Sequence, residues 1–199
     1  MDLPDMRCIS PKTPILVAIS GGVDSSVTAL LLKSKGFHVI GVTLKTWEGF
    51  SSKDARAVAD SLDIPYHIFD VSDRFQSEIV SYLVDEYVRG RTPNPCVRCN
   101  AEIKFRYLLD ARHEVGAEYV ATGHYARISI DPATGRFLLK KGKDDTKDQS
   151  YVLYRLTQHD LSSILFPLGD LTKDQVREAA SKADIPVAGK SESQEICFL

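Results

Sequence analysis

Two cysteines that lie three residues apart are the first feature of this 199-residue chain that could carry chemistry. Cys96 and Cys99 lie in the stretch TPNPCVRCN, and Cys197 lies in SQEICF near the end of the sequence. Arg98 stands beside Cys99, and a nearby guanidinium favours the reactive thiolate over the thiol. Because cysteines are too sparse here for a disulfide scaffold, the pair points to metal or redox chemistry. Cys8 has no comparable context, and we assign it no role.

A second candidate site is a glycine-rich turn, SGGVDSS at residues 20–26, which we call the glycine loop. Consecutive glycines let backbone N–H groups turn toward an anion, and the helix that follows contributes its positive N-terminal end. Ser20, Ser25 and Ser26 add hydroxyl donors, whereas Asp24 would repel phosphate unless it faced Mg²⁺ or a polar group. The spacing matches neither a Walker loop nor a dinucleotide-binding fingerprint. The loop therefore predicts a phosphate-binding turn of another kind.

The elements that must position these groups alternate between strand and helix patterns. Strands are expected at 15–19, 37–44, 66–71 and 118–122, and helices at 27–36, 52–62, 73–88 and 104–115. This alternation predicts an α/β fold with a doubly wound, mostly parallel sheet. A β-hairpin over 126–141 and helical segments near 151–165 and 172–183 would form a small C-terminal extension. Residues 89–100 are expected to form an extended, rigid loop because of Pro93 and Pro95.

Composition narrows the class of protein. The hydrophobic fraction of 43% and the charged fraction of 26% are typical of globular domains, and no apolar run is long enough to span a membrane. A net charge of −2 excludes a polybasic nucleic-acid binder. A local basic patch near the cysteines could still meet an RNA backbone; it comprises Arg89, Arg91, Arg98, Lys104 and Arg106. Since the first residues lack the apolar core of a secretory signal, we expect a cytoplasmic protein with reduced thiols and no membrane association.

The glycine loop resembles the pyrophosphate (PP) loop of the N-type ATP pyrophosphatases. Seven segments in order resemble the tRNA-specific 2-thiouridylase (MnmA) family: SGGVDSS, TLKTW, TPNPCVRCNAEIKF, ATGHYAR, KDQSYVLYRL, FPLGDLTKDQVR and GKSESQEICF. The resemblance implies a fold like the adenine nucleotide alpha hydrolases, with a leader at 1–14 and an adenylating catalytic domain at 15–199. The family's central and C-terminal β-barrel domains are expected to be absent from this chain.

The resemblance also implies roles for individual residues. Those expected to bind ATP are Ala18, Ile19, Ser20, Gly21, Gly22, Val23, Asp24, Ser25, Leu44 and Gly123. Cys99 matches the family's nucleophile and Cys197 its persulfide carrier. Those expected to contact tRNA are Asn94, Pro95 and Cys96, at the target base, with His124, Lys147, Asp148 and Gln149. The implied partners are ATP with Mg²⁺, tRNA and a sulfur-donor protein, either a persulfide relay or a cysteine desulfurase.

The implied reaction is ATP-dependent sulfur transfer to the 2-position of the wobble uridine, because adenylation turns the C2 oxygen into a leaving group that a persulfide sulfur can displace. Cys96, Cys99 and Cys197 could instead hold a [4Fe–4S] cluster, or they could bind zinc with His124 as a fourth ligand. Two other functions stay open: an amide-forming synthetase of the NAD or GMP synthetase kind, and a truncated relative that binds tRNA or ATP without turnover.

Overall fold

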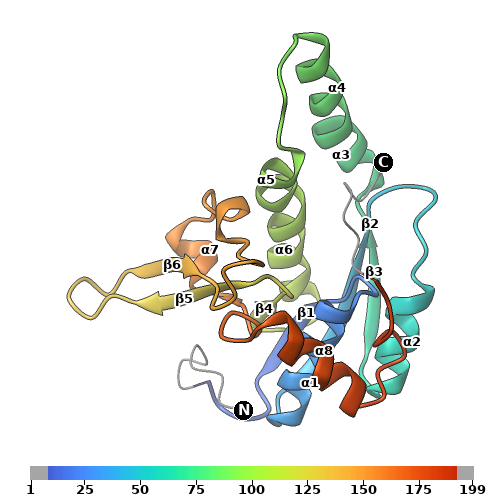
Figure 1. The fold of residues 1–199 in the computed structure, drawn as a ribbon, viewed down its shortest axis with the longest axis vertical. Helices are drawn as coiled ribbons and strands as arrows, with labels where there is room; N and C mark the ends of the chain where they lie inside the picture. Colours follow the sequence, from blue (N-terminus) through green and yellow to red (C-terminus); the bar gives the residue numbers. More distant parts are fainter. Residues whose placement is uncertain (1–8, 192–199) are drawn as a thin grey trace.

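A parallel sheet forms the centre of the molecule, of which the computed structural model describes residues 9–191. The strands of this sheet are β1 (Pro14–Ala18), β2 (His38–Lys45), β3 (Tyr66–Asp70), β4 (Tyr119–Ala121) and β7 (Ile164–Leu165). They lie in the order β3-β2-β1-β4-β7, and each neighbouring pair is parallel (Figure 1). The predicted doubly wound fold is confirmed, and the four predicted strands agree with the structure to within one residue at each end.

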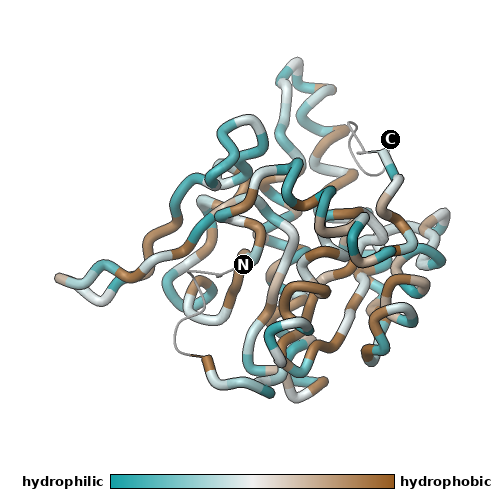
Figure 2. The backbone as a smooth tube through the Cα atoms, turned by 60° about the horizontal axis from the view of Figure 1, so that its bottom comes forward, coloured by the Kyte–Doolittle hydropathy of each residue, from teal (hydrophilic) through white to brown (hydrophobic). Residues whose placement is uncertain are grey.

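Helices cover both faces of the sheet because successive side chains of a strand point to opposite faces. On one face, Ile15 and Val17 of β1 belong to a core with α1 (Val23–Ser34), α2 (Lys53–Ser61) and α8 (Lys173–Lys182). On the other face, Leu16 packs with Leu108 and Ala111 of α6 (Arg106–Glu114). Figure 2 shows hydrophobic segments running through this layered body. The predicted helices 27–36, 52–62 and 172–183 are thus confirmed as α1, α2 and α8.

A long helical region links β3 to β4 and carries the cysteine pair. It consists of α3 (Ser72–Phe75), the π-helical turn η1 (Gln76–Val80), α4 (Ser81–Val88), α5 (Pro95–Cys99), the π-helical turn η2 (Asn100–Phe105) and α6. The predicted helix 73–88 is confirmed as the continuous run α3–η1–α4. In Figure 1 this run projects from one end of the molecule, and α5 and α6 form a column that leads back to the sheet.

The region after β4 matches the prediction only in part. The predicted hairpin is confirmed as β5 (Ala126–Ile130) and β6 (Phe137–Lys141), which pair antiparallel. The helical segments predicted near 151–165 are confirmed only as a 3₁₀ turn, η3 (Ser150–Val152), and a single helical turn, α7 (Gln158–Leu161), and the stretch ends in a strand, β7. Thr157 starts α7 with a capping box, but the chain soon returns to the sheet to pair with β4. A strand of two residues has no periodicity from which it could be predicted.

Candidate active site

The glycine loop lies at the carboxyl end of β1, where the order of strands reverses. The chain passes from β1 to β2 on one side while β4 lies on the other, and doubly wound sheets bind ligands at such switch points. Gly21 has a φ of +77°, and a Cβ added there would lie 2.9 Å from Cβ of Asp54 on α2. A Cβ added to Gly123, just after β4, would lie 3.0 Å from the backbone nitrogen of Ser25. Close packing therefore requires glycine at both positions.

Gly21→Ala is expected to distort the loop and abolish most ATP binding. The left-handed conformation alone costs an alanine about 1–2 kcal/mol, and the contact with Asp54 adds to this. Gly36→Ala is a matched control, because Gly36 has a φ of +84° but no atom within 4 Å of its added Cβ. Urea unfolding and calorimetric titration with ATP would compare the two variants. Equal ATP affinity in both would contradict a phosphate-binding role for the loop.

Serine side chains hold the loop in shape from within. The Ser25 hydroxyl accepts a hydrogen bond from the backbone N–H of Ser20 at 3.1 Å and donates to the carbonyl of Gly22 at 3.1 Å. Ser26 is fully buried and donates to the same carbonyl at 2.8 Å. The expectation that Ser26 offers a free hydroxyl donor is therefore wrong, since its hydroxyl lies in the first turn of α1. Ser20 is exposed at the mouth of the loop.

Asp24 faces a positive group, as its position in the loop required, but that group is a lysine. Lys173, the first residue of α8, places its Nζ 2.7 and 2.8 Å from the two carboxylate oxygens of Asp24. The Tyr125 hydroxyl donates to Oδ1 of Asp24 at 2.8 Å. Lys173 is buried, with 8% of its surface exposed. Sequence reasoning missed Lys173 and Tyr125, which lie 149 and 101 residues from Asp24 along the chain.

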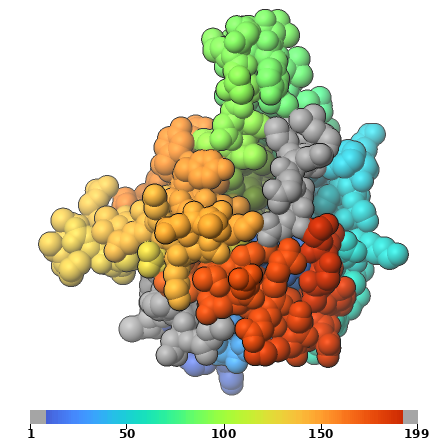
Figure 3. All heavy atoms as spheres, in the orientation of Figure 1, coloured from blue at the N-terminus to red at the C-terminus, as the bar shows by residue number. Residues whose placement is uncertain are grey.

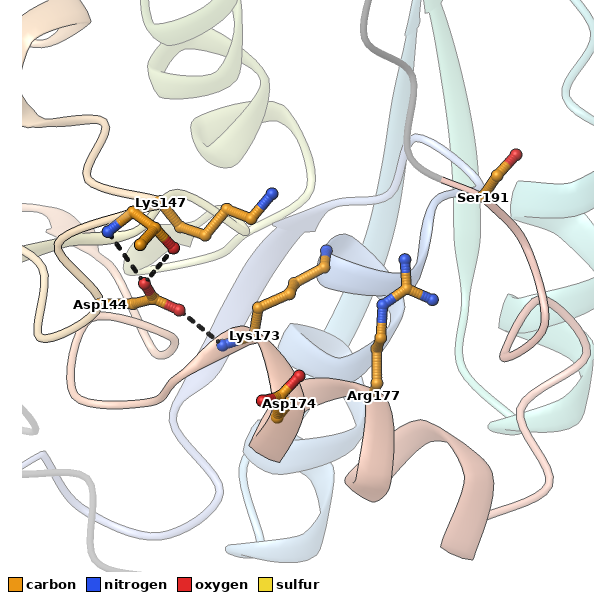
Figure 4. Close-up of a pocket in the computed structure, with 7 residues that line it drawn as sticks. Asp144, Lys147, Lys173, Asp174, Arg177 and Ser191 are labelled. Atoms are coloured by element: carbon orange, nitrogen blue, oxygen red, sulfur yellow. Dashed lines mark hydrogen bonds between the residues drawn. The ribbon is translucent and has the colours of Figure 1, made fainter.

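A polar cavity of about 550 Å³ opens beside this ion pair. Its lining residues are Asp144, Thr146, Lys147, Lys173, Asp174, Arg177 and Ser191. The side chains of Lys147, Lys173 and Arg177 point toward the same space (Figure 4). Asp144 links two segments at the edge of the cavity, because it accepts hydrogen bonds from the backbone N–H groups of Thr146 at 3.0 Å and Lys173 at 2.9 Å. Three cations around one cavity suit a multiply charged anion.

Of the three consecutive residues predicted to contact tRNA, Lys147 lines the cavity, whereas Asp148 and Gln149 bind their own chain. Asp148 accepts hydrogen bonds from the backbone of Gly142 at 3.0 Å and from the Ser150 hydroxyl at 2.9 Å. Gln149 bonds to the backbone of Tyr125 through both its side chain and its own N–H, at 3.1 and 2.9 Å. These two side chains shape the segment that presents Lys147.

The cysteine pair lies on a helix, so the predicted loop over 89–100 is corrected for residues 95–100. The side chain of Asn94 caps α5 by accepting from the backbone N–H groups of Cys96 at 3.1 Å and Val97 at 3.4 Å. Pro95 occupies the first helical turn, where a missing N–H costs nothing. An Asn–Pro pair thus acts here as a helix start rather than as a loop signal.

The two thiols differ in their surroundings. Cys96 is exposed, whereas Cys99 is half-buried and packs against the cluster of Val71, Phe75, Ile79 and Ile103. The guanidinium of Arg98 lies over the ring of Tyr82, 4.7 Å from its centroid. Cys197 and Cys8 lie outside the described residues.

The nucleotide-binding prediction covers four further residues at the sheet edge. Ala18 ends β1, and the N–H of Ile19 donates to the carbonyl of Val42 at 2.8 Å. Ile19 and Val23 are buried in the core, so only their backbone groups are available to a ligand. Leu44, near the end of β2, is half-buried between the sheet and the cluster around Cys99.

Lys190 is a further residue that the sequence did not single out. Its Nζ lies 2.6 Å from Oδ2 of Asp54 and donates to the carbonyl of Gly21 at 3.2 Å. The hydrogen bond from Lys190 lowers the pKa of Asp54. The segment that leads toward Cys197 is thereby attached to the glycine loop.

His124 is buried between two aromatic rings. Its ring centroid lies 5.7 Å from that of Phe105 and 5.9 Å from that of Phe166, and its Nδ1 is 2.8 Å from Oγ1 of Thr122. Burial, with a smaller contribution from Lys104, holds the pKa of His124 well below its usual value. Contact with RNA would require these surroundings to open.

Within residues 9–191 no three His, Cys, Asp or Glu side chains gather as a metal site, so Cys96, Cys99 and His124 do not form the zinc set.

The buried imidazole predicts a pH dependence of stability. Since the pKa of His124 is depressed in the folded state, the unfolded chain binds the extra proton below a pH of about 6.5. The free energy of unfolding should therefore fall as the pH drops, by up to about 1.4 kcal/mol per pH unit. Urea unfolding between pH 7.5 and pH 5 would measure this decrease, and His124→Gln should flatten the plot of the free energy of unfolding against pH. The control His159→Gln, at an exposed histidine, should leave the slope of this plot unchanged. A wild-type slope in His124→Gln would contradict the assignment of the pH dependence to His124.

A family model described as the tRNA methyl transferase HUP domain matches residues 13–199. The chain belongs to this family. Its curated relatives include tRNA-specific 2-thiouridylases MnmA from Caldanaerobacter subterraneus, 53% identical over 93% of this chain, and from Caldicellulosiruptor saccharolyticus, 48% identical over 94%. The chain spans only 55% and 56% of the length of these two proteins. The resemblance to the 2-thiouridylases is confirmed.

Solved structures show how widely this HUP-domain fold is shared. A 4-thiouridine synthetase–RNA complex with bound ATP superposes with a TM-score of 0.64 at 17% identity, over 94% of this chain and 45% of the other. An NH₃-dependent NAD synthetase from Campylobacter jejuni gives 0.53 at 16% identity, over 96% and 74%. At such identities the likeness shows the fold alone.

In residues 9–191 of this HUP-domain protein, no helix has the length and apolar character needed to cross a bilayer.

Proposed function

We propose that this chain is the adenylating and sulfur-transferring part of a tRNA uridine 2-sulfurtransferase. The observation that carries the proposal is the ion pair between Asp24 of the glycine loop and Lys173, which lines a cavity together with Lys147 and Arg177. Backbone N–H groups on one side and cations on the other suit the triphosphate of ATP. The relatives named 2-thiouridylases, at about half identity, support the class of reaction.

In the proposed reaction the C2 oxygen of the wobble uridine attacks the α-phosphorus of ATP, and pyrophosphate leaves. The C2 oxygen is then part of AMP, a good leaving group. Sulfur from a Cys197 persulfide forms a bond to C2, and the C2–O bond breaks as AMP departs. The Cys99 thiolate attacks the inner sulfur of Cys197, either to release hydrosulfide beforehand or to free the thiolated base afterward. Both routes leave a Cys99–Cys197 disulfide, which a two-electron thiol reductant returns to two thiols.

The implied Mg²⁺ would be held through Asp24, the carboxylate of the glycine loop. Both oxygens of Asp24 are bound to Lys173 in this structure, so metal binding would need Lys173 to release one of them. A [4Fe–4S] cluster is the alternative use of the cysteines. Cys96 and Cys99 lie one helical turn apart on α5 and suit two thiolate ligands, and Cys197 would supply the third.

The competing proposal is an amide-forming synthetase. The fold is compatible with it, because NAD synthetases share this architecture. The cysteine helix counts against it, since amide formation gives no role to Cys96 and Cys99, and the 2-thiouridylase relatives count against it as well. A relative that binds ATP or tRNA without turnover is the third possibility, and turnover measurements separate it from the sulfurtransferase.

We further propose a cytoplasmic site of action and a protein sulfur donor, which is either a persulfide relay or a cysteine desulfurase.

Pyrophosphate release from ATP and Mg²⁺, with and without tRNA that lacks the 2-thio group, tests the proposal. The protein would be purified anaerobically and its visible spectrum recorded first, because a cluster absorbs where a persulfide does not. Release that depends on this tRNA supports the proposal. Release that depends on ammonia and a small carboxylate would replace it with the synthetase, and ATP binding without release would favour the non-catalytic relative.

A further inference from the structure

Two exposed tyrosines, Tyr151 and Tyr154, lie beside the cysteine helix and have no role in the site described above. Their exposed fractions are 61% and 70%. Val152 and Leu153 between them are buried, at 6% and 1%. The segment is thus anchored by its aliphatic side chains while both rings stay in solvent.

The backbone that carries the two rings is held by consecutive tight turns. The N–H of Val152 donates to the carbonyl of Gln149 at 3.2 Å, and the N–H of Leu153 donates to that of Ser150 at 3.1 Å. Turns with this i+3 pattern bring side chains three residues apart to the same side of the chain. The turn η3 packs against α5, and Arg155 pairs with Glu102 of η2 at 2.6 Å. The rings are therefore pre-positioned on a fixed support beside α5.

A hollow of about 300 Å³ begins at Arg155, directly after the second ring. Its polar lining consists of Arg106, Arg112, His113, Arg155 and His159, with the carboxylates Asp110 and Asp160. Arg112 is more than nine-tenths buried and donates to the carbonyl of Glu118 at 3.1 Å, which holds its guanidinium in place. Since three arginines face two carboxylates in this lining, the hollow offers a place for an anionic oxygen.

We propose that Tyr151, Tyr154 and this hollow form a binding surface for single-stranded RNA, in which the rings stack on unpaired bases and the hollow takes a backbone phosphate. Figure 3 shows the orange segment that contains both tyrosines at the surface, beside the green atoms of α5 and α6. Aromatic rings interleaved with cations are the usual composition of such surfaces. The inference rests on the proposed function, because the bases that would stack here are neighbours of the base brought to Cys99.

Fluorescence anisotropy with a labelled, unmodified anticodon stem-loop whose wobble base is uridine tests this surface on the full 199-residue chain. Tyr151→Ala and Tyr154→Ala should each weaken binding roughly tenfold, and Tyr154→Phe should retain it, because stacking needs the ring and not the hydroxyl. Tyr87→Ala is the matched control, since Tyr87 on α4 is similarly exposed at 57%. An RNA duplex of equal length should bind all variants alike, because its bases are already stacked.

The hollow is tested separately through salt dependence. Arg106→Gln should reduce the slope of log affinity against log salt by about 0.7, the value for one lost phosphate contact to a single strand. An unchanged slope would overturn the phosphate subsite, and alanine variants that bind the stem-loop like the wild type would overturn the stacking surface. Both results leave the proposed function standing. A wild-type chain that binds ATP but no stem-loop would overturn the tRNA substrate and this inference together.

Discussion

Lys173→Met should lower the rate of tRNA-dependent pyrophosphate release by roughly 10²- to 10³-fold, the usual effect of removing one group that stabilises developing charge. Lys173 is buried at the start of α8 and contacts both carboxylate oxygens of Asp24. Lys173 is thus a cation that both contacts the glycine loop and lines the cavity. Under the proposed function, its removal takes positive charge away from the leaving pyrophosphate.

The measurement is kcat and KM for ATP with saturating tRNA. Lys182→Met is the matched control, because Lys182 lies on the same helix, has a side chain that is 74% exposed and pairs with Glu178 one turn away. A Lys173→Met enzyme with more than half of the wild-type kcat would show that the ion pair is only structural.

Lys173 also shows what the sequence can and cannot reveal about such a site. The glycine loop was recognisable because all of its determinants are local: an apolar strand, two glycines and a helix start within a dozen residues. The partner of Asp24 comes from a helix 149 residues later, and nothing in that helix's own pattern marks its first lysine as buried. Only the packing of α8 against α1 brings the two side chains together.

The strands β1 and β2 were predictable because buried parallel strands are continuous apolar runs. The prediction for the cysteine segment is wrong for a different reason. Its prolines indicate a loop, although Asn94 and Pro95 together satisfy the requirements of a helix N-terminus. Reading the cap would have placed Cys96 and Cys99 on one helix, three residues apart. Charge pairing across the fold, as in Lys190 with Asp54, has no signal in a single sequence.

Cys99→Ser should abolish 2-thiouridine formation, by on the order of 10³-fold or more, while pyrophosphate release continues. The separation is expected because Cys99 lies on α5, whereas the groups placed around ATP belong to the glycine loop, the segment at Lys147 and α8. A serine hydroxyl has nearly the same shape as the thiol but does not ionise near neutral pH, so it cannot attack a persulfide. Mass spectrometry of nucleosides from the treated tRNA would measure the product, and a coupled assay would follow pyrophosphate in the same reaction.

Cys96→Ser, on the same helix, is the control for Cys99→Ser. It also distinguishes the persulfide mechanism from the iron–sulfur cluster mechanism. Under the persulfide mechanism Cys96 has no bond to make, so its exposed side chain can be replaced with at most a few-fold loss. Under the cluster alternative Cys96 and Cys99 are equivalent ligands, so both variants should lose thiolation and any visible absorbance together. Cys99→Ser enzyme that thiolates at the wild-type rate would contradict both mechanisms. Cys96 is exposed and Cys99 is half-buried, which favours unequal roles for the two thiols. A nucleophilic thiol is better oriented for attack in a fixed, partly buried environment than when it is fully exposed.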